Sequence, residues 1–71
     1  MNLLEVSVGA EYTVDSVATR DEELNSFLFS LGCFPGEPIT VVSRRRSCLV
    51  VAIKDGRYCI DRNLAEAISV K

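Results

Sequence analysis

Three cysteines, one run of arginines and one run of acidic residues are the side chains best suited to chemistry in this chain. Cys33, Cys48 and Cys59 are widely spaced and form no C-x-x-C pair. An odd number of cysteines in so small a chain argues against a complete disulfide framework, and the absence of histidine removes the commonest nitrogen ligand of zinc or iron. We therefore expect three reduced thiols that act as small buried hydrophobic residues, with a shared metal or redox site as the alternative.

Arg44, Arg45 and Arg46 lie in a predicted hairpin loop, where guanidinium groups can form paired hydrogen bonds with carboxylates or phosphates. We predict that this run contacts a protein partner. An acidic protein surface suits it better than nucleic acid, because few aromatic residues remain for base stacking. The alternative is that the arginines only keep the loop soluble and discourage edge pairing.

Asp21-Glu22-Glu23 is the only cluster of hard metal ligands, but adjacent residues on a helix point in different directions. We expect these acids to stabilise a helix start, with weak cation binding or contact with a basic partner as the alternative. No metal and no cofactor is predicted. The sequence contains no phosphate-binding loop, dinucleotide fingerprint, nucleophile elbow or histidine, so we predict that the protein is not an enzyme.

The composition fits one small globular domain spanning residues 1–71, with 48% hydrophobic and 25% charged residues. No apolar run approaches the roughly 20 residues that cross a bilayer, and the N-terminus lacks the features of a secretory signal. We therefore expect a cytoplasmic protein. The net charge of −2 is too small to attract DNA or an anionic membrane over long range.

A helix is predicted from Asp21 to Leu31, preceded by a capping box formed by Thr19 and Glu22. The stripe expected to face the core consists of Leu24, Phe27, Leu28 and Leu31. Phe29 falls off this stripe, and we expect the N-terminal Leu3-Leu4 to cover it, with a protein-binding contact as the alternative.

Two glycine-dependent turns follow the predicted helix. Gly32 occupies the position where a helix end needs a left-handed backbone, and Phe34 can fold back onto the last helical turn. Pro35-Gly36 fits the centre of a type II turn. These signals define the scaffold and carry no chemistry.

Strands are predicted over residues 11–18, 38–44, 48–54, 57–60 and 67–70. Asp55-Gly56 indicates a type I′ hairpin, and a bulge is expected near Ser16-Val17. Asp61 caps a single helical turn before the last strand. We predict a mainly β protein, a small antiparallel barrel with one α-helix between its first two strands and over one opening.

The segments that combine into a family pattern are Gly9 before the Tyr12/Val14 strand, Leu31-Gly32-Cys33-Phe34-Pro35-Gly36, Ile39–Val42, Leu49–Ile53, Asp55-Gly56 and Leu64–Val70. With this pattern the whole chain resembles the ferrous iron transport protein A (FeoA) family, whose fold is an SH3-like β-barrel that also ends some metal-dependent repressors. Where family members often carry a Gly-Asp-Pro type turn, this chain has Ser43-Arg44-Arg45-Arg46-Ser47, so the loop differs in shape and charge.

The resemblance implies a non-enzymatic, cytosolic accessory of bacterial ferrous iron uptake. Such a protein would act on the cytoplasmic GTPase-bearing part of the FeoB membrane transporter, and would be peripheral to the membrane only through that partner. Two alternatives remain: a small barrel that binds nucleic acid, and a metal-regulatory interaction domain. For the second, we expect no complete repressor, because the chain contains no helix-turn-helix domain.

Overall fold

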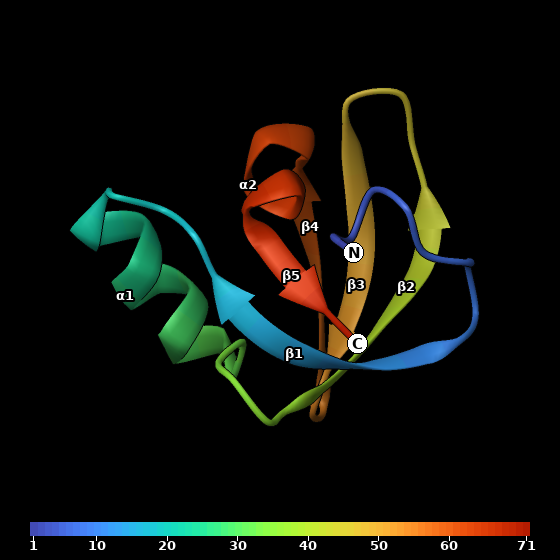
Figure 1. Cartoon of the computed structure of the whole chain (residues 1–71). Helices are drawn as coiled ribbons and strands as arrows, with labels where there is room; N and C mark the ends of the chain where they lie inside the picture. The colour runs from blue at the N-terminus through green and yellow to red at the C-terminus, as the bar shows by residue number, and fades with distance from the viewer.

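The computed structural model describes residues 1–71 and contains one five-stranded antiparallel sheet with two helices (Figure 1). The strands are β1 (Glu11–Val17), β2 (Pro38–Arg44), β3 (Cys48–Ile53), β4 (Gly56–Asp61) and β5 (Ile68–Val70), in the spatial order β4-β3-β2-β1-β5. Helix α1 (Glu22–Leu31) connects β1 to β2, and α2 (Arg62–Ala67) connects β4 to β5. The predicted mainly β, antiparallel architecture is confirmed.

The sheet curls because two pairs of strands carry irregularities. The β1–β5 register shifts between Val14 and Ser16, next to the position where a bulge was predicted. The β2–β3 register shifts between Val41 and Ser43. Such shifts increase the local twist and let a short sheet wrap around one core. The molecule accordingly measures 28 × 25 × 23 Å.

The curled sheet encloses one cluster of fifteen buried residues, all hydrophobic. Leu49, Val51 and Ile53 of β3 point into it, while the residues between them are partly buried on the other face. Leu64 and Ala65 of α2 enter the same core. Asp61 caps this helix by accepting a hydrogen bond from the Leu64 backbone N–H at 2.7 Å. The predicted cap at Asp61 is thus confirmed.

The N-terminal segment closes the barrel beside β5. Leu3 is fully buried, and its backbone N–H donates to the carbonyl oxygen of Ile68 at 3.2 Å. Val6 enters the core from the same segment. The expectation that Leu3-Leu4 covers Phe29 is therefore wrong, because this segment is tied to β5 and leaves Phe29 64% exposed.

Helix α1 begins at a different cap from the predicted one. Asp21 accepts hydrogen bonds from the backbone N–H groups of Glu23 (2.9 Å) and Leu24 (3.4 Å). The predicted capping box of Thr19 and Glu22 is wrong, since the Thr19 hydroxyl accepts from the backbone N–H of Asp21 instead (3.2 Å). The carboxylate of Asp21, two residues after Thr19, thus satisfies the free N–H donors of the first turn.

The end of α1 follows the prediction. Gly32 has a left-handed backbone (φ 94°), its N–H donates to the carbonyl of Phe29 (3.0 Å), and the N–H of Cys33 donates to the carbonyl of Leu28 (2.9 Å). This pair of hydrogen bonds is a Schellman motif. Gly36 also has a positive φ of 94°, so both glycine-dependent turns are confirmed.

Helix α1 stands beside the barrel (Figure 1). Leu28 is its only buried residue, whereas Leu24 is 38% and Phe27 48% exposed. The predicted stripe is therefore correct for Leu28 and for Leu31, which packs against the core. It is wrong for Leu24 and Phe27. The expectation that the helix lies over one opening is also wrong, because it stands beside the barrel (Figure 1). The N-terminal segment and α2 contribute Leu3 and Leu64 to the core.

The β3–β4 hairpin forms, but its turn lies one residue earlier than predicted. Ile53 pairs with Gly56, so Lys54 and Asp55 are the central residues, and Lys54 has a positive φ of 54°. Gly56 does not have a positive φ and begins β4. Its missing side chain leaves room for Tyr58, whose ring and hydroxyl would collide with a Cβ at position 56.

Candidate functional site

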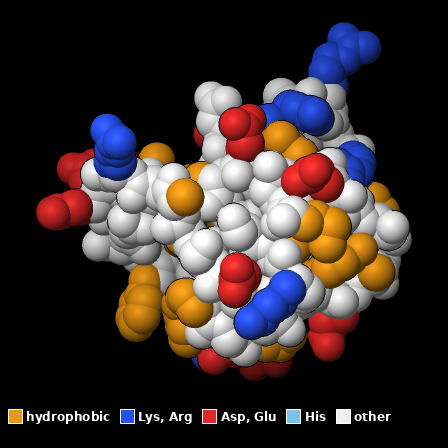
Figure 2. Space-filling view, viewed as in Figure 1, with side chains coloured by type: hydrophobic (Ala, Val, Ile, Leu, Met, Phe, Trp, Pro, Cys, Tyr) orange, Lys and Arg blue, Asp and Glu red, His pale blue; other side chains and the backbone are white.

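The three arginines singled out by the sequence do not act together. The guanidinium of Arg44 donates to the carbonyl oxygens of Leu4 (Nη1, 3.0 Å) and Val6 (Nη2), so it fastens the N-terminal segment to the end of β2. Arg45 and Arg46 are exposed, and Figure 2 shows Lys and Arg side chains projecting from the end of the molecule that carries the β2–β3 hairpin. Two of the three predicted contact residues are therefore free to meet a partner.

Replacing Arg44 by alanine is expected to lower the free energy of unfolding by about 1 kcal/mol, because two carbonyl oxygens lose a charged donor. Arg45→Ala is the matched control and should stay within about 0.5 kcal/mol of the wild type, since this side chain forms no hydrogen bond or ion pair. Urea denaturation followed by circular dichroism measures both. Equal effects of the two variants would contradict the structural role of Arg44.

Phe29 belongs to an aromatic cluster where α1 ends. Its ring stacks on that of Phe34 in the α1–β2 connection, with ring centroids 4.9 Å apart and planes inclined by 32°. The ammonium of Lys54 lies 5.1 Å from the centre of the Phe34 ring, within cation–π range. A Cβ on Gly32 would lie only 3.0 Å from the Lys54 side chain, so glycine is needed there for space as well as for conformation. These contacts hold Phe29 in place while most of its ring faces solvent.

Two hollows flank the pair formed by Phe29 and Phe34. One, of about 360 Å³, lies between α1 and the end of β1, with Val17 and Cys33 in its lining. The other, of about 460 Å³, lies between the end of α1 and the β3–β4 turn, with Tyr58 in its lining. Both aromatic rings therefore stand between two concave surfaces, the form that a protein-binding surface uses to take up side chains.

The three residues of the acidic run, Asp21-Glu22-Glu23, have different roles at the start of α1. Asp21 is used as the cap, and Glu22 and Glu23 are exposed on the first turn of α1. The structure brings together no group of three or more His, Cys, Asp or Glu side chains that could hold a metal ion. A groove of about 700 Å³ runs between α1 and α2, and its charged lining residues are Arg20, Asp61 and Glu66.

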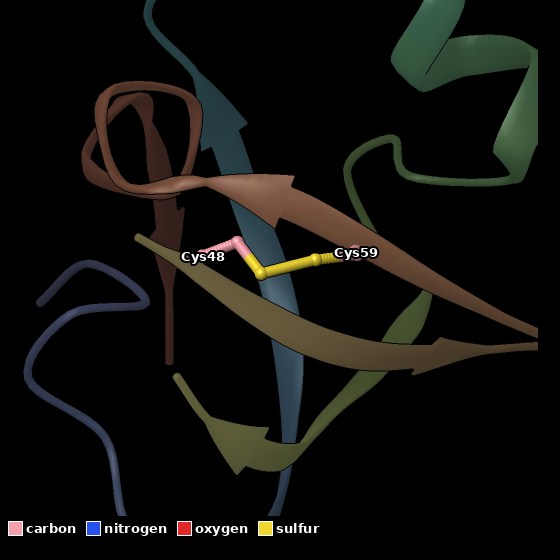
Figure 3. Close-up of a disulfide and its surroundings, with 2 residues drawn as sticks. All are labelled: Cys48 and Cys59. Atoms are coloured by element: carbon pink, nitrogen blue, oxygen red, sulfur yellow. A yellow bond between two sulfur atoms is a disulfide. The ribbon is translucent and has the colours of Figure 1, made fainter. Parts of the chain in front are cut away.

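Two of the three cysteines form a disulfide. Cys48 of β3 is bonded to Cys59 of β4, with Cα atoms 6.1 Å apart (Figure 3). The expectation of three reduced thiols is therefore wrong for these two. Val50 lies opposite Cys59 in the β3–β4 ladder, so the two cysteines are diagonal neighbours on one face, and this spacing falls within the range that a disulfide spans. Cys59 is on the exposed face of the edge strand, so the bond is open to reductants.

Cys33 is the one free cysteine, and it is buried as predicted, with 2% of its surface exposed. Burial removes water from the thiolate and raises the pKa of the Cys33 thiol to about 11. The folded state therefore favours the neutral thiol. Stability is expected to fall as the pH rises from the unfolded value of 9.0 toward the folded value of about 11.

Alkylation of Cys33 by iodoacetamide at pH 8 is expected to be at least about 100-fold slower in the folded than in the urea-unfolded protein, because a rise of about two pKa units cuts the thiolate fraction by that factor. Mass spectrometry of samples quenched over time gives both rates. A Cys33→Ala variant should show no fast labelling in either state. Comparable rates for folded and unfolded wild type would contradict the burial of this thiol.

A short, curled sheet of five antiparallel strands around one core defines the class of small SH3-like barrels. No helix of the structure is both long and apolar enough to cross a bilayer. The model of the FeoA domain matches residues 1–71, so the chain belongs to the FeoA family, which is implicated in ferrous iron transport. The resemblance inferred from the sequence pattern is confirmed.

Solved structures agree with this assignment. The FeoA of Chlorobium tepidum is 28% identical, with a TM-score of 0.90 over 99% of this chain and 68% of its own. The FeoA of Stenotrophomonas maltophilia, a prokaryotic SH3 domain protein solved with zinc, is 22% identical, with a TM-score of 0.87 over 100% of this chain and 89% of its own. A manganese-dependent transcriptional repressor shares the fold at 24% identity and a TM-score of 0.88, over 99% of this chain and 40% of its own. No curated protein matches the sequence significantly.

Proposed function

We propose that this protein is a non-enzymatic, cytoplasmic accessory of ferrous iron uptake that binds and modulates the cytoplasmic GTPase-bearing part of the FeoB transporter. The observation that carries the proposal is the match to the FeoA family over the whole chain. Support comes from a surface that offers protein contacts at two places, the exposed Phe29 beside α1 and the free Arg45 and Arg46 on the β2–β3 turn. Aromatic and arginine side chains are the types enriched at the energetic centres of protein interfaces.

An NMR titration tests this proposal. The ¹⁵N-labelled protein is titrated with the purified cytoplasmic part of FeoB from the same organism, once with GDP and once with a non-hydrolysable GTP analogue. Saturable shifts confined to one face are expected, and a difference between the two nucleotides would show that the contact senses the state of the GTPase. A parallel titration with single-stranded RNA should leave the spectrum unchanged.

Binding to RNA in place of FeoB would be an equally clear result. Clear shifts with RNA and none with the FeoB fragment would contradict the proposal and favour the nucleic-acid-binding alternative. The basic β2–β3 turn would then be the first place to look for the shifts, because phosphate contacts depend on Lys and Arg.

A further inference from the structure

Helix α1 leaves large hydrophobic side chains in solvent. The chain has five exposed large hydrophobic residues, and Leu24 (38%), Phe27 (48%) and Phe29 (64%) all lie on this one helix of ten residues. Single exposed hydrophobic side chains are normal, but several on one short element mark an interaction surface. Leu24 lies only about 40° around the helix from the buried Leu28 and lines the groove between α1 and α2, so Phe27 and Phe29 are the two that project from the flanks of the outer side. We call the surface formed by Phe27 and Phe29 the α1 ridge.

The helix is held at its ends and at one point between them. Helices shorter than about 12 residues are marginal in water on their own, so α1 depends on these supports. They are the Asp21 cap, the Gly32 end, the contact of Phe29 with Phe34, and the buried Leu28. None of them covers the outer side of α1, so the ridge is presented in a fixed orientation, with Phe29 acting both as a support of the helix and as part of the exposed surface.

The outer side of α1 carries small side chains along its middle and an aromatic ring on each flank, an arrangement that can fit a groove. At about 100° per residue, Ser26 and Ser30 lie opposite the buried Leu28, with Phe27 and Phe29 on the two flanks. Both serines are small, and the hydroxyl of Ser30 donates to the carbonyl of Phe27 at 2.6 Å, so it can be buried without losing its partner. A groove floor can therefore approach the serines closely while its walls contact the two aromatic rings.

The charges of the molecule separate along the chain. Residues 1–37 carry seven acidic and one basic side chain, whereas residues 38–71 carry three acidic and seven basic ones. The α1 ridge belongs to the acidic part, with Glu22 and Glu23 exposed on its first turn. The small net charge of the whole chain does not reveal this asymmetry. Because of the asymmetry, the ridge has an acidic border and the β2–β3 turn is basic.

We propose that α1 docks as a helix into an apolar groove bordered by Lys and Arg side chains on a protein partner. Resting on the function proposed above, that partner is FeoB, and the groove lies on its cytoplasmic part. The apolar groove matches the ridge, and the basic border matches Glu22 and Glu23. The β2–β3 turn, which the sequence suggested as the contact, then lies outside the docked surface.

Other occupants fit the ridge less well. The acidic border is repelled by RNA phosphates and by the anionic surface of a cytoplasmic membrane leaflet. A second copy that paired through its own α1 would bring two acidic helices together. Phe27 and Phe29 are suited to act as anchors, because buried aromatic side chains contribute most of the affinity in protein interfaces.

Binding to full-length FeoB in nanodiscs, measured by biolayer interferometry, tests the docking mode. Phe27→Ala is expected to weaken binding by about 30-fold, which is the size of a hot-spot truncation. Ser26→Arg should weaken it by at least about 10-fold, because it adds bulk and a like charge at the groove floor. Neither residue is buried, and arginine is a better helix former than serine, so both variants should fold normally.

Matched controls separate the possible outcomes. Ser47→Arg places the same new side chain on the exposed β2–β3 loop, and it should bind as the wild type does. If Ser26→Arg and Phe27→Ala bind normally while Arg45→Ala fails, FeoB is the partner but the docking mode is wrong. If the wild type does not bind FeoB, both proposals fail. Binding to empty anionic nanodiscs, or dimerisation that Phe27→Ala abolishes in sedimentation, would overturn the choice of occupant.

Discussion

Replacing both Cys48 and Cys59 by alanine is expected to lower the free energy of unfolding by about 3 kcal/mol. The two cysteines are 11 residues apart, and a cross-link that closes a loop of this length removes conformational freedom mainly from the unfolded chain. Small domains have total stabilities of about 5–15 kcal/mol, so the loss would be a large part of the whole. Guanidinium denaturation of the variant and of the oxidised wild type measures the difference.

Reduction provides an independent check of the same quantity. Dithiothreitol should destabilise the wild type to the level of the double variant and leave the double variant unchanged. A count of free thiols in the unreduced, denatured wild type should give one, from Cys33, rather than three. Three free thiols, or identical denaturation curves before and after reduction, would contradict the disulfide.

The bond connects an edge strand to the rest of the sheet. Strand β4 pairs only with β3, and the disulfide joins the two strands near the end of the ladder at which α2 begins. Edge strands are the parts of a sheet that open most easily to new partners. Amide exchange in β4 is therefore the place where reduction should have its largest local effect.

This disulfide was not predicted, because an odd number of cysteines without a C-x-x-C pair favours reduced thiols and the predicted hairpin register gave no reason to revise that. Centring the hairpin on Asp55-Gly56 would place Cys59 opposite Ala52, four residues along the strand from Cys48 and too far for a bond. The observed turn at Lys54 and Asp55 shifts the register by two residues and places Cys59 opposite Val50. Local turn propensity favoured glycine at a central position, whereas in the structure Gly56 pairs with Ile53 and a tyrosine side chain packs over it.

Elements with strong local signals were predicted well. The left-handed helix end at Gly32 and the Asp61 cap depend on neighbours in the sequence, and both agree with the structure. The α1 stripe had the correct helical spacing, but spacing does not say which segment reaches the core first. Leu3 and Leu64 enter the core from segments distant in sequence, whereas Leu24 and Phe27 remain outside.

The candidate site was predicted in part for the same reason. Phe29 was identified because it breaks the helical pattern, and the structure places it on the surface. Arg44 was grouped with its neighbours because sequence adjacency does not reveal that a side chain reaches carbonyls about forty positions away. Phe27 was assigned to the core. Counting charges separately in the two halves of the chain would have pointed to the acidic border of α1.

Leu28→Ala is expected to lower the free energy of unfolding by about 3 kcal/mol and to loosen α1 before the rest of the molecule. Leu28 is 1% exposed and is the only buried residue of α1, so truncation removes the main packing contact between this helix and the core. Truncating a buried leucine costs about 2–5 kcal/mol, because both the transfer free energy and the cavity contribute. Hydrogen exchange measured by NMR should show faster exchange in α1 than in β2 and β3.

The same variant separates a scaffold role from a contact role when it is compared with Phe27→Ala. Leu28→Ala should weaken FeoB binding by weakening the support of the ridge, and Leu28→Met, which nearly conserves the volume, should restore most of both properties. Phe27→Ala should weaken binding and lower the free energy of unfolding by only about 1 kcal/mol, less than Leu28→Ala does, because nearly half of that side chain is already in solvent. If Leu28→Ala lost stability but bound FeoB as tightly as the wild type, an ordered α1 would not be needed for docking. In that case the contact would have to lie on the barrel itself, with Arg45 and Arg46 as the first residues to replace.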